Sequence, residues 1–139
     1  MYNAAKKYNA DVVSSGINFL EHAPMGYDKE EVLDSSNKFE VSNTLTRFLN
    51  NKIIKRDIWD KVDYSPRRYI EDTQTCYFVL FFANTIVNLQ YIGYNYTENP
   101  TSLCHSASNI KTLIYQALCA KDLCEFVAEH KKEELNDFL

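Results

Sequence analysis

The chain has 139 residues and a formal net charge of −4, with 15 Lys and Arg against 19 Asp and Glu. This length allows one domain with one core, and the acidic balance gives no electrostatic footprint for nucleic acid, so we exclude that class of partner. Three Gly and three Pro are too few turn-formers for a sandwich of many short strands. We therefore expect an α/β (α+β-like) fold, with a few strands and packed helices.

The first predicted elements are a helix over residues 1–8 and a buried strand over residues 12–19. The helix is rich in Ala and Lys, whereas the strand contains β-branched and small residues. No capping residue or turn precedes the helix, so we expect that sequence is missing upstream and that the two elements are the second half of a β-α-β crossover. Residues 21–37 are polar and irregular and predict a solvated loop.

The middle of the chain predicts a helix over residues 41–49, a short strand over residues 52–56 and a helical turn over residues 57–62. Glu71 and Asp72 then head a helix that continues into an apolar run ending at Ala83. The helix dipole and the free N–H groups of a first turn favour anions at this position. A carboxylate at the mouth of a buried helix is also a candidate general base.

The last third predicts an extended stretch over residues 85–96, a loop, and a long helix capped by Ser106 or Ser108. This helix begins at about residue 106. Its apolar positions repeat with the 3.6-residue helical period: Ile110, Leu113, Ile114, Ala117 and Leu118.

The four cysteines predict reduced thiols and no metal site. Cys76 lies inside the apolar run, and Cys119 and Cys124 lack the spacing of a zinc knuckle. Cys104 and His105 are adjacent, but no second close pair accompanies them. Neither a signal peptide nor an apolar run of membrane-spanning length is present, so we expect a cytoplasmic location.

A series of short motifs gives these elements a chemical context. In chain order they are Tyr8-Asn9-Ala10-Asp11-Val12-Val13, Asn51-Lys52-Ile53-Ile54-Lys55-Arg56, Tyr69-Ile70-Glu71-Asp72-Thr73, Tyr94-Asn95-Tyr96 and Ser102. In this order the motifs resemble the second half of a family-two inverting glycosyltransferase of GT-A fold, over roughly residues 1–105. The long final helix lies outside the common pattern.

The resemblance implies that residues 1–139 form a single domain, a partial GT-A domain that contains the acceptor side. Asp72 would take the proton from the acceptor hydroxyl as that oxygen attacks the anomeric carbon of a nucleotide-sugar. Glu71 would lie beside it and influence acceptor binding or the electrostatics of the site. The implied acceptor-binding residues are Asn51, Lys52, Tyr94, Tyr96 and Ser102, of which the last three would close the site.

The resemblance also implies a nucleotide-sugar donor and a divalent metal. The family's donor half, with its metal-holding Asp-x-Asp, is not in this chain, and Thr97 stands where the family often places an Arg. We therefore expect an acceptor-side fragment that is inactive alone. Its implied partners are a sugar or glycan acceptor, a lipid-linked acceptor that would give peripheral membrane association, and a missing half or oligomer partner that covers an exposed edge.

A different class of function is a non-catalytic interaction module that uses the long amphipathic helix and an aromatic surface. Glu71 and Asp72 would then be only a charge pair favourable to the helix dipole. In the enzyme, Asp72 should lie near Tyr94 or Ser102. In the interaction module it should point to solvent or pair with Arg67 or Arg68.

Overall fold

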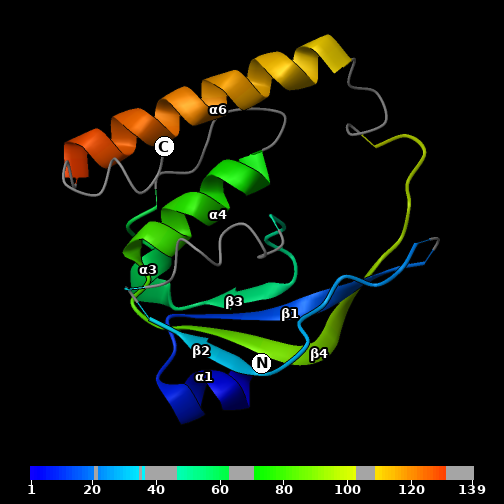
Figure 1. Ribbon diagram of the computed structural model, residues 1–139, viewed down its shortest axis with the longest axis vertical. Coiled ribbons are helices and arrows are strands. Elements are labelled where there is room, and N and C mark those ends of the chain that lie inside the picture. Colours follow the sequence, from blue (N-terminus) through cyan, green and yellow to red (C-terminus); the bar gives the residue numbers. More distant parts are fainter. Residues whose placement is uncertain (21, 35, 37–46, 63–70, 103–108, 131–139) are drawn as a thin grey trace.

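The computed structural model describes residues 1–20, 22–34, 36, 47–62, 71–102 and 109–130. In these residues one mixed sheet is covered by helices on both faces, which confirms the predicted α/β class (Figure 1). The strands are β1 (Val12–Phe19), β2 (Glu31–Leu33), β3 (Lys52–Ile54) and β4 (Ile86–Tyr96). The helices are α1 (Tyr2–Tyr8), α3 (Arg56–Trp59), α4 (Glu71–Phe82) and α6 (Asn109–His130).

The sheet has the strand order β2-β4-β1-β3, so β4 and β1 form its centre. These two strands run parallel, whereas β3 pairs antiparallel with β1 and β2 pairs antiparallel with β4. The prediction of an irregular loop over residues 21–37 is wrong for β2, in which Leu33 lies opposite Ile86. Pairing with β4 overrides the polar local sequence, because Leu33 becomes almost fully buried there.

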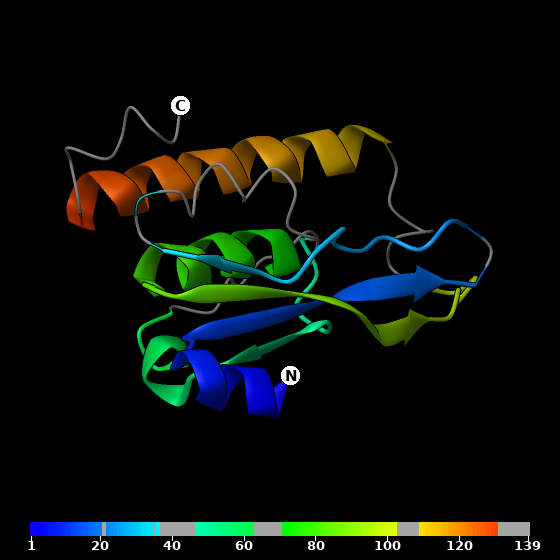
Figure 2. The same cartoon turned by 60° about the horizontal axis from the view of Figure 1, so that its bottom comes forward.

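Two apolar clusters fix the helices to opposite faces of the sheet. One cluster joins α4 to β1 and β4, and its members include Val12, Val79, Ala83 and Ile86. The other cluster lies under α1. Figure 2 shows the resulting layers, with α1 on one side of the sheet, α4 on the other, and α6 beyond α4.

The apolar face predicted for the last helix does not belong to the core. Ile110, Leu113 and Ile114 are 70%, 64% and 53% exposed. The physical reason is orientation as well as length: the helical period puts Ile110 half a turn from the buried Cys119, and the 12 residues of α4 can cover only part of the 22 residues of α6. The second half of α6 makes the contact, because Phe126 packs on Phe78 and other phenyl rings of α4.

Two further boundaries differ from the prediction. Residues 47–49 of the predicted helix 41–49 are not helical, because a turn from Leu49 to Lys52 leads directly into β3. The rest of that helix lies outside the described residues, as do Ser106 and Ser108. Among the described helices, none has the length and apolar character needed to cross a bilayer.

Asp11 ties the start of β1 to the loop between α4 and β4. Its Oδ2 accepts hydrogen bonds from the backbone N–H groups of Asn84 at 2.8 Å and Thr85 at 3.3 Å, and Oδ1 lies 3.4 Å from Lys55 Nζ. We expect Asp11→Ala to lower the free energy of unfolding by about 1–3 kcal/mol, because it removes the buried carboxylate that accepts from two part-buried backbone N–H groups. Urea unfolding measures this change. Asp28→Ala, at an exposed position, is the control, and an equal loss there would contradict the prediction.

Candidate functional site

Asn51 and Lys52 form a polar group at the beginning of β3. Asn51 is 1% exposed, and its Nδ2 donates to the carbonyl oxygen of Ser15 at 2.5 Å and to Ser14 Oγ at 3.4 Å. Lys52 Nζ donates to Asn51 Oδ1 at 2.8 Å and to the carbonyl oxygen of Phe48 at 2.6 Å. The Asn51 amide therefore fixes the lysine ammonium against the middle of β1.

The first turns of α4 bring Asp72 into the same group. Asp72 and Cys76 are four residues apart and so lie on one face of the helix. Burial lowers the pKa of the Lys52 ammonium, whereas the negative charges of the Cys76 thiolate, which forms only at high pH, and of Asp72 act to raise it. Burial raises the pKa of the Cys76 thiol to about 11, which keeps it neutral at ordinary pH. Asp72 is thus a carboxylate within electrostatic range of Lys52, although twenty residues separate them in the sequence.

Tyr96 approaches this group through an aromatic cluster. Its ring centroid lies 5.4 Å from that of Phe19 and 6.3 Å from that of Phe48, and all three rings are half-buried. The carbonyl oxygen of Phe48 is an acceptor of the Lys52 ammonium. The aromatic cluster of Phe19, Phe48 and Tyr96 therefore adjoins the polar group.

The other predicted site residues are Tyr94, Glu71 and Ser102. Tyr94 lies on β4 opposite Ile17, and Glu71 is the first residue of α4. Ser102 Oγ is buried and has no hydrogen-bond partner within the described ranges. No contact described in this structure joins Tyr94 or Ser102 to Lys52. Arg67 and Arg68 lie outside the described residues, so pairing of Asp72 with them stays a prediction.

Three neighbours of the site were not predicted from the sequence as functional residues. Cys76 could have been found, because it follows Asp72 by one helical turn. Phe19 and Phe48 carry no such signal, since their contact joins segments that are 29 residues apart and follows only from the paths of β1 and β3.

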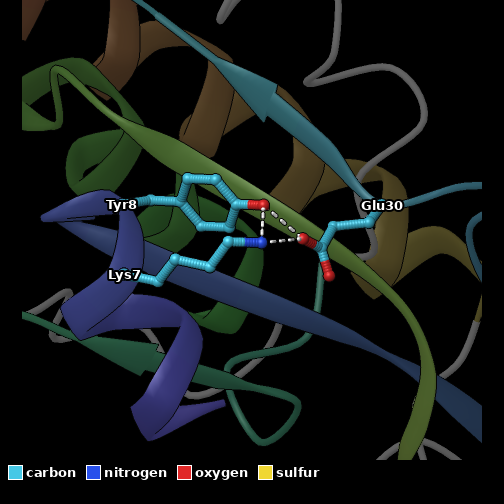
Figure 3. Close-up of polar contacts among 3 residues, drawn as sticks. All are labelled: Lys7, Tyr8 and Glu30. Carbon is cyan, nitrogen blue, oxygen red and sulfur yellow. Dashed lines mark hydrogen bonds and ion pairs between the residues drawn. The ribbon is translucent and has the colours of Figure 1, made fainter.

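A second polar group, on the surface, consists of Lys7, Tyr8 and Glu30 (Figure 3). Tyr8 OH donates to the Glu30 carboxylate and accepts from Lys7 Nζ. The hydrogen bond from Tyr8, with the one from Lys7, lowers the pKa of Glu30, and the hydrogen bond to Tyr8 raises the pKa of Lys7. This exposed group connects α1 to the segment before β2, so we assign it a structural role.

The described residues do not fit a metal. They contain no group of three or more His, Cys, Asp and Glu side chains placed to share an ion. Cys76, Cys119 and Cys124 are not in disulfides, and Cys104 lies outside the described part of the chain. We therefore assign no residue to the divalent metal that the resemblance implies, and derive no chemical step through it.

Comparison with protein-family models and with curated proteins found no match for this chain.

The raised pKa of Cys76 predicts low thiol reactivity in the native state. We expect iodoacetamide to label Cys76 about a hundredfold more slowly at pH 8 than the half-buried Cys124, because the thiolate is the reactive form. The Cys76 rate should climb with pH until about 11. Peptide mass spectrometry distinguishes the two sites. A Cys76 rate that levels off near the pH of an ordinary thiol, about 8.5, would contradict the prediction.

Proposed function

We propose that this chain is the acceptor-side part of an inverting glycosyltransferase that transfers a sugar from a nucleotide-sugar to a hydroxyl acceptor, in polysaccharide or glycan synthesis. One observation carries the proposal: Asn51, Lys52 and Asp72, which come from two separate motifs, form one group in three dimensions. Chance placement of a charged helix start would not require a half-buried lysine within its electrostatic range, held by a buried amide.

In this mechanism Asp72 is the general base. As the acceptor oxygen forms its bond to the anomeric carbon, the bond from that carbon to the diphosphate breaks on the opposite face. The acceptor proton passes to the Asp72 carboxylate, and the diphosphate leaves with the bonding electron pair. Lys52 would act through charge, because an ammonium nearby favours the ionised carboxylate that can accept a proton.

The aromatic cluster supports a sugar as the acceptor. Phe19, Phe48 and Tyr96 are half-buried beside Lys52, so part of the cluster is open to solvent. The C–H face of a sugar ring is attracted to the negative face of an aromatic ring. An acceptor ring on Tyr96 would therefore place hydroxyl groups on the side of Lys52 and Asp72. Bound to a lipid, such an acceptor would bring the chain to a membrane surface.

Acceptor binding tests the proposal directly. We expect saturation-transfer NMR to detect binding of one class of mono- or oligosaccharide, and Tyr96→Ala to weaken that binding at least about tenfold by removing the stacking surface. Tyr91→Ala is the matched control, because Tyr91 lies on the same strand and is 61% exposed. Asp72→Asn should leave the affinity within about threefold, since a base acts on the reaction and not on ground-state binding.

Absence of saccharide binding across a broad panel would overturn the acceptor role. Equal losses in Tyr96→Ala and Tyr91→Ala would move the binding site away from the aromatic cluster. We expect the 139-residue chain to transfer no sugar by itself. Transfer from a nucleotide-sugar by this chain would contradict its proposed dependence on a separate donor half.

The second candidate, a protein-interaction module, is favoured by one specific observation. Ile110, Leu113 and Ile114 expose more than half of their surface on a single helix face. Soluble chains rarely leave a contiguous apolar patch of this kind without a partner.

A further inference from the structure

The outward face of α6 carries a stripe of apolar residues along its whole length. In its first half the stripe contains Ile110, Leu113, Ile114 and Ala117, all of which are exposed. Cys119, on the opposite face, is buried. The 3.6-residue period places Ile110 and Cys119 half a turn apart, so the stripe points away from α4.

The side chains of this stripe change in size from one end of the helix to the other. Large aliphatic side chains occupy positions 110, 113 and 114, whereas Ala stands at positions 117, 120 and 128 and Cys at position 124. The spacing is close to a heptad repeat, in which two helices can lie side by side. Large residues pack best against small ones on the facing helix. An antiparallel neighbour of the same sequence would provide this match at both ends.

The charges of α6 also differ between its first and second halves. Lys111 is the one charged residue in the first half, residues 109–120. In the second half Asp122 faces α4, where its carboxylate accepts a hydrogen bond from Gln74, and the remaining charges of Lys121, Glu125 and Glu129 sum to −1. Antiparallel pairing sets the positive half of one helix beside the negative half of the other, and the helix dipoles are then also opposed. Parallel pairing would place like charges together.

We propose that the outward face of α6 binds the α6 of a second copy of this chain, antiparallel and about a two-fold axis near Ala117 and Ala120. Such an isologous contact closes as a dimer. A lipid surface fits the stripe less well, because the acidic second half would be repelled by anionic headgroups. The dimer extends the interaction role of α6 and does not depend on sugar transfer.

The expected strength follows from the size of the contact. A helix of 22 residues is about 33 Å long and can supply only the lower end of the area of a specific interface. We therefore expect a dimer with a dissociation constant in the micromolar range.

Sedimentation equilibrium of the full chain tests the dimer between about 1 and 500 µM. We expect concentration-dependent dimerisation, weakened at least about thirtyfold by the double variant L113E/I114E, since each change buries a charge in the contact. Leu20→Glu is the matched control, because Leu20 is 63% exposed and lies outside α6. A monomer at every concentration, or a dimer that L113E/I114E leaves intact, would overturn the proposal. Circular dichroism should show both variants folded, because the replaced side chains are exposed.

Disulfide trapping tests the orientation of the two helices. In a Cys124→Ser background, Ala117→Cys should form an intermolecular disulfide on mild oxidation, because position 117 lies near the proposed axis. Ile110→Cys should not, since antiparallel pairing holds the two copies of that residue far apart. Efficient crosslinking through position 110 would establish a parallel pair and overturn the antiparallel arrangement.

Vesicles of phosphatidylcholine and phosphatidylserine test whether the apolar stripe binds a membrane surface instead of a second copy of the chain. We expect the chain to remain in the supernatant when they are sedimented. Vesicle binding by a chain that is monomeric in solution, if L113E/I114E abolishes it, would assign the stripe to a membrane surface and overturn the dimer.

Discussion

Replacing Asn51 by Ala is expected to lower the free energy of unfolding by about 2–4 kcal/mol. Asn51 is 1% exposed, and both the nitrogen and the oxygen of its side-chain amide form hydrogen bonds. Its Nδ2 donates hydrogen bonds to the Ser15 carbonyl oxygen and to Ser14 Oγ, and its Oδ1 accepts one from Lys52 Nζ. Without it, the buried Ser15 carbonyl loses a donor and the half-buried Lys52 ammonium loses one of its acceptors. Urea unfolding monitored by circular dichroism measures the change.

Asn50→Ala provides the matched control for Asn51→Ala. The two residues are adjacent and identical in type, but Asn50 is exposed. Its replacement should change stability by less than about 0.5 kcal/mol, as is usual for surface positions. Equal effects of the two substitutions would mean that the Asn51 hydrogen bonds contribute little. They would also remove the physical reason for Lys52 being held near Asp72.

The centre of the fold could be predicted from sequence because its signals are local. The β-branched pairs Val12-Val13 and Ile86-Val87 lie in β1 and β4, where they are buried on both faces of the sheet. The helix over Glu71–Phe82 follows from a charged start and a long apolar run. In contrast, β2 depends on pairing with β4, which no property of Glu31–Leu33 specifies.

The candidate site was predictable only in part. Sequence motifs singled out Asp72 and Lys52, and the structure places them within electrostatic range of each other. The pairing of Phe19 with Tyr96 follows from the register of β1 on β4, which includes irregularities near Gly16 and so cannot be counted from the sequence. The hydrophobic period of α6 was visible, but periodicity alone does not tell which apolar face meets the core.

Replacing Phe126 by Ala is expected to lower the free energy of unfolding by about 2–4 kcal/mol and to loosen α6 from α4. The Phe126 ring centroid lies 4.4 Å from that of Phe78 and 4.9 Å from that of Phe81, and the ring of His130 stacks on it at 4.3 Å. Truncation removes this packing and leaves a cavity between the helices. Thermal unfolding and amide hydrogen exchange across α6 measure the two effects.

Leu113→Ala distinguishes the two faces of α6. Leu113 is 64% exposed, so in the monomer its truncation should change stability by less than about 0.5 kcal/mol. At concentrations where the dimer forms, the same change should lower the apparent stability, because a partner that binds only the folded chain stabilises it by mass action. Phe126→Ala should be destabilising at every concentration. If Leu113→Ala has the same effect in dilute and concentrated protein, the outward face of α6 binds no second copy of the chain. The helix then contributes to stability only through the face that packs on α4.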